Sequence, residues 1–202
     1  MTRVFIDNRE IEPAIAGMPL DQVLKNIEAA HIGEDSVIRE VLINGEALTP
    51  ETLTSRTIRN SMERMPGNGR IDVFTGDRDE IANGAIAEAL ACLDRIERVS
   101  PCIAESFIES PTRGALEDLH QLCEGFYWTT VLLDKLEAGY QIRPARPEAR
   151  EKAHRLLENI HAARSRGDFL HLARLLEHGL APLLPFFRES LNAVSGKANA
   201  VH

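Results

Sequence analysis

The sequence predicts an α+β protein: a small mixed sheet with one helix, followed by an antiparallel α-helical bundle. The main observation is a change of periodicity near Gly76. Before it, short β-branched runs alternate with turn signals; after it, apolar residues recur every three or four positions until about Val194. The expected division is an α/β module at 1–76, a helical bundle at 77–195 and a disordered tail at 196–202. With 44% hydrophobic residues in a chain of 202, the modules could be separate domains or share one core.

The first module contains runs of β-branched residues bounded by turn residues. Asp7 and Asn8 belong to a predicted turn over 7–10, and Asn44-Gly45 is the strongest hairpin signal because both positions tolerate positive φ. Thr49 caps a predicted short helix that Pro50 begins. The remaining predicted elements are strands at 4–6, 11–15, 37–43 and 70–75, with a helix over 19–30.

The second module begins at Asp77, whose carboxylate is a good helix cap with Glu80 three residues later. A break is predicted at Ser100-Pro101 because proline removes a backbone donor. Pro182 and Pro185 are expected to kink or split the last helix for the same reason. The predicted helices cover 77–99, 102–108, 112–138, 148–166 and 169–191.

Charge and composition exclude several functions. A formal charge of −8 and a pI near 5.4 argue against nucleic-acid binding, which depends on Lys and Arg at phosphates. Three cysteines without CxxC spacing favour a reducing compartment. Neither a signal peptide nor an apolar run of about 18 residues is recognisable, so we expect a cytoplasmic protein without a membrane span.

His154, Glu158 and His161 are the candidate metal ligands, because their spacing puts them on one helix face. They lie beside the apolar stripe and not within it, which favours solvated residues. Cys123 lies three residues from His120, a spacing that could activate a thiolate, but an inert thiol in the apolar face is the favoured interpretation. The phosphate-binding and hydrolase motifs GxxxxGK[ST], GxGxxG and GxSxG do not occur. We therefore expect no cofactor, and no catalytic residue is assigned.

Aromatic residues gather at 126–128, which hold three of the ten in the chain. Phe126 points into the apolar stripe, whereas Tyr127 and Trp128 depart from it. Phe186 lies in a second segment that is too apolar for a single stripe. Tyr127, Trp128 and Phe186 are thus the candidate partner-binding residues, since Trp and Tyr dominate binding hot spots. Packing within the molecule is the alternative.

The element order of residues 1–76 resembles the β-grasp arrangement of ubiquitin-like and sulfur-carrier proteins. Their exposed C-terminal Gly-Gly has no counterpart here, because Asp77 and a helical region follow Gly76. The resemblance therefore bears on the fold alone.

The complete architecture is similar to a group of uncharacterised bacterial proteins with a β-rich head and a segment of the form Leu-x-x-Leu-x-Glu-Gly-Phe/Leu-x-Trp. Residues 119–128 match this form. Some members lie among motility genes, which implies a cytoplasmic accessory role. The leading hypothesis is a non-enzymatic protein-interaction or accessory module that binds a protein partner or itself. The alternative is a metal-dependent or small-molecule enzyme with a site between the two modules.

Overall fold

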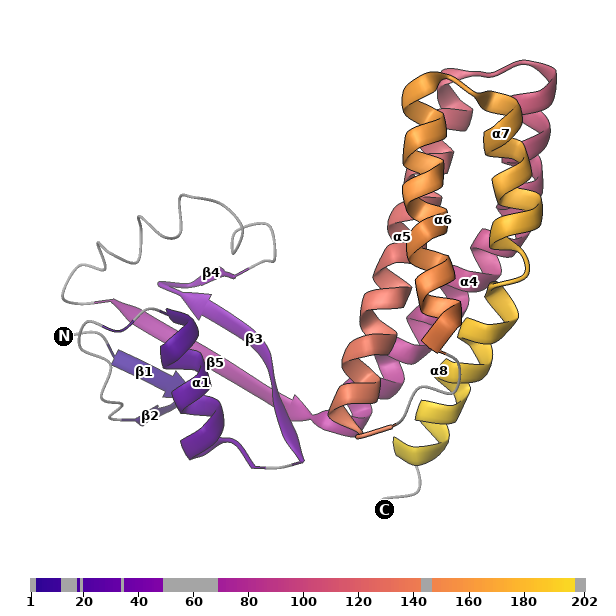
Figure 1. Ribbon diagram of the computed structural model, residues 1–202. Helices are drawn as coiled ribbons and strands as arrows, with labels where there is room; N and C mark the ends of the chain where they lie inside the picture. The colour runs from indigo at the N-terminus through magenta and orange to yellow at the C-terminus, as the bar shows by residue number, and fades with distance from the viewer. Residues whose placement is uncertain are drawn as a thin grey trace. The chain divides into compact units, whose positions relative to one another are not determined.

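The computed structural model describes residues 3–11, 18, 20–33, 35–48, 69–142 and 147–198, whose elements are shown in Figure 1. The chain divides into two compact units, residues 1–81 and 82–202. The described part of the first unit holds a small mixed sheet with helix α1 (Leu20–His31), and helices make up the described part of the second. The α+β class predicted from the change of periodicity is confirmed.

Five strands are present among the described residues of the first unit, in the order β2-β1-β5-β3-β4. They are β1 (Arg3–Ile6), β2 (Arg9–Ile11), β3 (Ser36–Ile43), β4 (Glu46–Ala47) and β5 (Arg70–Asp77). The central strands β1 and β5 pair in parallel, and the other pairs are antiparallel. Helix α1 (Leu20–His31) follows β2 and precedes β3. This mixed sheet, with α1 as the crossover helix that the described residues include, is β-grasp-like in its arrangement.

The core of this unit lies between α1 and one face of the sheet. Alternate residues of a strand point to opposite faces, so Val4, Ile71 and Val73 share the face toward the helix. These three side chains pack with Leu20, Val23, Ile27 and Val41. The apolar stripe of α1 is therefore buried, as its helical spacing predicts.

Two tight turns position the strands. Asn44 and Gly45 have φ of 53° and 87°, so the hairpin predicted from this pair is present. The first turn is shorter than expected: Asp7 and Asn8 both adopt positive φ, and β2 begins directly after them. The Asp7 carboxylate accepts hydrogen bonds from the Thr75 hydroxyl (2.6 Å) and backbone N–H (2.9 Å), which lower the pKa of Asp7. The helix predicted from Thr49 lies outside the described residues.

Helix α4 (Arg78–Glu109) follows β5 directly, and the Asp77 carboxylate caps it by accepting from the Glu80 N–H at 2.8 Å. The break predicted at Ser100-Pro101 is wrong, because α4 continues through the proline. Buried apolar residues lie on both sides of it, with Ile96 before and Ile103 and Phe107 after. Their burial offsets the missing backbone bond, which costs about 3 kcal/mol within a helix.

The remaining helices are α5 (Arg113–Gly139), α6 (Pro147–Arg166), α7 (Phe169–Arg174), the π-helix η1 (Leu175–Leu180) and α8 (Leu184–Ala198). Thr112 caps α5 by accepting from the Ala115 N–H at 3.1 Å. Gly167, with a φ of 68°, ends α6, and the Asp168 carboxylate caps α7. These caps satisfy backbone N–H groups that a helix leaves unpaired at its start.

The turn over 181–183, which contains Pro182, separates α8 from the preceding helix, so the predicted split is confirmed, while Pro185 lies in the first turn of α8. The π-helical turn before these prolines was not expected. Helix α8 extends through Ala198, so residues 196–198 are helical and do not belong to the expected tail. The rest of that tail, 199–202, lies outside the described residues.

The helices of the second unit form an antiparallel bundle (Figure 1). The Phe107 ring at the end of α4 contacts Phe169 at the start of α7, with 5.7 Å between centroids. The Phe126 ring of α5 meets Phe187 of α8 edge-on at 5.1 Å, and both side chains are fully buried. Among the described residues, no helix is both long and apolar enough to cross a bilayer.

Candidate functional site

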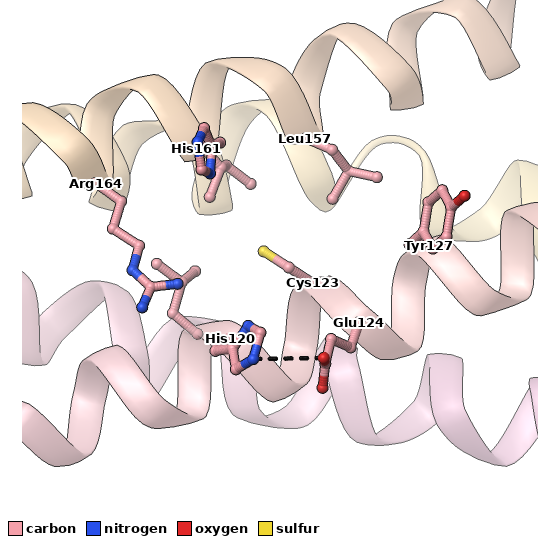
Figure 2. Close-up of a pocket in the computed structure, with 9 residues that line it drawn as sticks. His120, Cys123, Glu124, Tyr127, Leu157, His161 and Arg164 are labelled. Carbon is pink, nitrogen blue, oxygen red and sulfur yellow. Dashed lines mark ion pairs between the residues drawn. The ribbon is translucent and has the colours of Figure 1, made fainter. Parts of the chain in front are cut away.

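A pocket of about 260 Å³ opens between α5 and α6, and we call it the α5–α6 pocket (Figure 2). Leu119, Cys123 and Tyr127 recur at intervals of four along α5 and therefore share the helix face toward α6. Leu157, Ile160 and Arg164 recur on the facing side of α6. The remaining lining residues are His120, Glu124 and His161.

The centre of the pocket is apolar, and its two ends differ. The buried residues Leu119 and Ile160 line it, and Figure 2 shows the Cys123 thiol pointing into the space between the helices. Tyr127 stands at one end and Arg164 at the other (Figure 2). The pocket thus has an aromatic end and a cationic end.

Burial raises the pKa of the Cys123 thiol to about 11, although the Arg164 guanidinium acts in the opposite direction. At neutral pH the thiol is protonated, and the thiol form is a weak nucleophile. His120 contacts Glu124, with 3.4 Å between Nε2 and Oε1, one turn along the same helix. The spacing of Cys123 and His120 therefore does not produce an activated thiolate, in keeping with the inert thiol that the sequence favours.

Arg164 is the arginine among the residues that line the pocket. Among the described residues none forms an ion pair with Arg164. The same holds for other exposed arginines of the bundle, such as Arg95 and Arg166, whereas Arg150, Arg155 and Arg188 each pair with a carboxylate. The side chain of Arg164 is exposed and reaches toward α5 (Figure 2). It leaves a positive charge available at the mouth of the pocket.

The three candidate partner-binding residues occupy different environments. The side chains of Tyr127 and Trp128 are 53% and 40% exposed, and Tyr127 lines the pocket. Trp128 lies one turn from Glu124 on the adjoining flank of α5. Phe186 is only 7% exposed, packs edge-on against Phe187 at 5.4 Å, and lines a separate groove of about 480 Å³ between α6 and η1–α8.

His154, Glu158 and His161 are all exposed on α6. Within the part of the chain that the structure describes, no three His, Cys, Asp or Glu residues lie close enough together to hold a metal ion. The structure therefore does not assemble these three residues into a metal site. Only His161 belongs to the α5–α6 pocket, with its ring on the α6 wall (Figure 2).

The structure separates residues 119–128 by role. Leu119, Leu122 and Phe126 are buried in the core of the bundle. Gly125 allows α5 to approach α4, because a Cβ at this position would lie 2.7 Å from the Cys92 Sγ. The remaining prominent side chains, His120, Cys123, Glu124, Tyr127 and Trp128, line the pocket or its flank.

Comparison with known proteins gives no relative: no protein-family model, curated protein or solved structure matches this chain significantly. The site must therefore be interpreted from its own chemistry.

Proposed function

We propose that the helical unit is a protein-interaction module and that its partner binds the α5–α6 pocket together with Trp128. We call the residues that line this pocket, together with Trp128, the docking surface. The observation that carries the proposal is the pair of adjacent exposed aromatic residues, Tyr127 and Trp128, beside a pocket with an apolar floor. Such side chains supply much of the binding energy at protein interfaces when they become buried.

The position of Trp128 distinguishes this surface from the rest of the bundle. Large apolar side chains of the described second unit are otherwise concentrated in its core, and the exposed ones are Ile108, Tyr127, Trp128 and Leu170. A single exposed Leu or Ile is ordinary on a protein surface. Tyr127 lines the pocket and Trp128 is its exposed neighbour in the sequence, and exposed aromatic residues close to a pocket are typical of a binding site.

The groove between two helices also favours a protein ligand. An amphipathic helix lying in such a groove can insert apolar side chains between the two supporting helices. Three free cysteines, Cys92, Cys102 and Cys123, support a role in the reducing environment of the cytoplasm. The alternative enzyme has less support, since the Cys123 thiol is protonated at neutral pH.

The proposal is tested by photocrosslinking in the cells that produce the protein. A benzophenone amino acid replaces Lys135, which is exposed and lies two turns from Trp128 along α5. The matched control carries the same group at Lys152, an exposed position that lines the other groove. We expect a discrete crosslinked protein from position 135 that disappears with Trp128→Ala. Identical products from both positions, or products insensitive to Trp128→Ala, would contradict the proposal.

A further inference from the structure

The α5–α6 pocket is chemically asymmetric, and this asymmetry restricts what the partner presents to it. Leu119, Leu157 and Ile160 supply an apolar wall and floor. Beyond them, Arg164, His161 and His120 gather three nitrogen-bearing side chains, of which Arg164 and His161 lie one turn apart on α6. An apolar group in the centre of the pocket would therefore have hydrogen-bond donors at one side.

Glu124, the acidic residue of the pocket, does not remove the preference of these donors for an acidic group. Glu124 lies on α5 within 3.4 Å of His120, so its carboxylate already has a partner. Arg164 has no ion-pair partner among the described residues, and its guanidinium presents five N–H donors that match a carboxylate. A carboxylate from outside is the group that complements it.

The pocket volume indicates how much of a partner enters. The pocket measures about 260 Å³ and is lined by nine side chains. It accommodates one bulky side chain and not a complete helix. The rest of a helical partner would lie over Tyr127 and Trp128 outside the pocket.

We infer that the partner is an amphipathic helix that inserts one bulky apolar side chain beside Cys123 and pairs an acidic side chain, one turn away, with Arg164. Residues three or four apart on a helix are about 5–6 Å from each other at Cβ, so one helix face presents both groups. This inference rests on the proposed function and adds the chemistry of the partner. Its support is the charge complementarity between the unpaired Arg164 and a carboxylate.

The test uses 4-phenylbutyrate as a probe of the two required groups, with the neutral 4-phenylbutyramide and the cationic 4-phenylbutylamine for comparison. The readout is the rate at which iodoacetamide alkylates Cys123 in the full chain, followed by peptide mass mapping. The exposed Cys102 is the internal reference, since it lies outside the pocket. At a probe concentration equal to its dissociation constant, the rate at Cys123 falls by about half.

We expect the carboxylate to protect Cys123 about ten-fold more tightly than the amide, because one charge-assisted hydrogen bond contributes roughly that factor. The amine is expected to protect least. Arg164→Gln removes the difference between acid and amide. Arg166→Gln, an exposed position on the same helix that is not part of the pocket, leaves the difference unchanged.

Equal protection by acid and amide, no protection by any probe, or full protection of the Arg164→Gln variant would overturn the inference. If Cys123 alkylation slows with rising protein concentration and no probe, a second copy of the chain is the occupant and the inference is also wrong. These failures differ from failure of the proposed function. Loss of the crosslink with Trp128→Ala would still show docking at this surface, with a partner of different chemistry.

Discussion

Replacing Glu137 should destabilise the helical unit more than any substitution of a surface charge. Arg150 at the start of α6 pairs with two carboxylates of α5, those of Glu137 and Asp134. The side chain of Glu137 is 6% exposed and that of Asp134 is 53% exposed, while Arg150 is 19% exposed. The Arg150 Nε is buried and has no hydrogen-bond partner, so the guanidinium depends on its two carboxylates for compensation.

The exposed fractions of these side chains determine how much each substitution should lower the free energy of unfolding. Glu137→Leu leaves a largely buried guanidinium with only the exposed Asp134, and loss of one partner of a buried pair costs about 3–5 kcal/mol. We expect the lower end, about 3 kcal/mol, because Asp134 remains. Asp134→Asn removes an exposed partner and should cost about 1 kcal/mol or less. The double variant Arg150→Met with Glu137→Leu should lie within about 1 kcal/mol of the parent, because no unpaired charge is left.

Urea unfolding of the full chain measures these differences. Trp128 is the single tryptophan of the chain and lies in the helical unit, so its fluorescence reports the unfolding of that unit. A cost for Glu137→Leu no larger than that for Asp134→Asn would refute the reasoning. A double variant less stable than Glu137→Leu alone would refute it as well.

Three further predictions concern the helices around the docking surface. Gly125→Ala should lower the free energy of unfolding, because the new Cβ would lie 2.7 Å from the Cys92 Sγ, whereas Gly84→Ala, with nothing within 4 Å, should raise it by about 0.5–1 kcal/mol in urea unfolding. The folded protein favours the neutral thiol of Cys123, which raises the pKa of this group from 9.0 to about 11. The free energy of unfolding should therefore fall as the pH rises from 9 toward 11, by up to about 1.4 kcal/mol per pH unit. Unfolding at pH 8 and 10.5 should show this loss in the parent, and Cys123→Ala should lack the contribution. Trp128→Ala should change the free energy of unfolding by less than about 0.5 kcal/mol, since the side chain is substantially exposed. The thermal midpoint should therefore stay close to that of the parent, and a large drop in it would indicate a packing role.

Local signals in the sequence predicted much of the fold because their physics is local. The turn at Asn44-Gly45 and the cap at Asp77 depend on backbone geometry within a few residues, and both are present. Pro101 did not end its helix, because the burial of apolar residues before and after it on α4 outweighs the local cost of a proline. The π-helical turn before Pro182 had no sequence indication that we recognised.

The docking surface was only half predictable. Tyr127 and Trp128 depart from the apolar stripe of their own helix, so periodicity alone identifies them as unusual. The facing wall required a pairing of α5 with α6 that no local pattern specifies. Arg164 is an example. Nothing in the sequence marks this arginine as unusual, and its place in the same pocket as Cys123 follows only from the packing of the two helices.

The most direct test of the docking surface is the affinity of its crosslinked partner for two alanine variants. Trp128→Ala removes an aromatic side chain at the pocket, and Leu170→Ala removes a side chain that is 60% exposed at the start of α7. Isothermal calorimetry should show binding weakened about 30-fold or more by Trp128→Ala, as for a hot-spot residue, and an unchanged affinity for Leu170→Ala. Parent-like affinity of the Trp128→Ala variant would contradict the account.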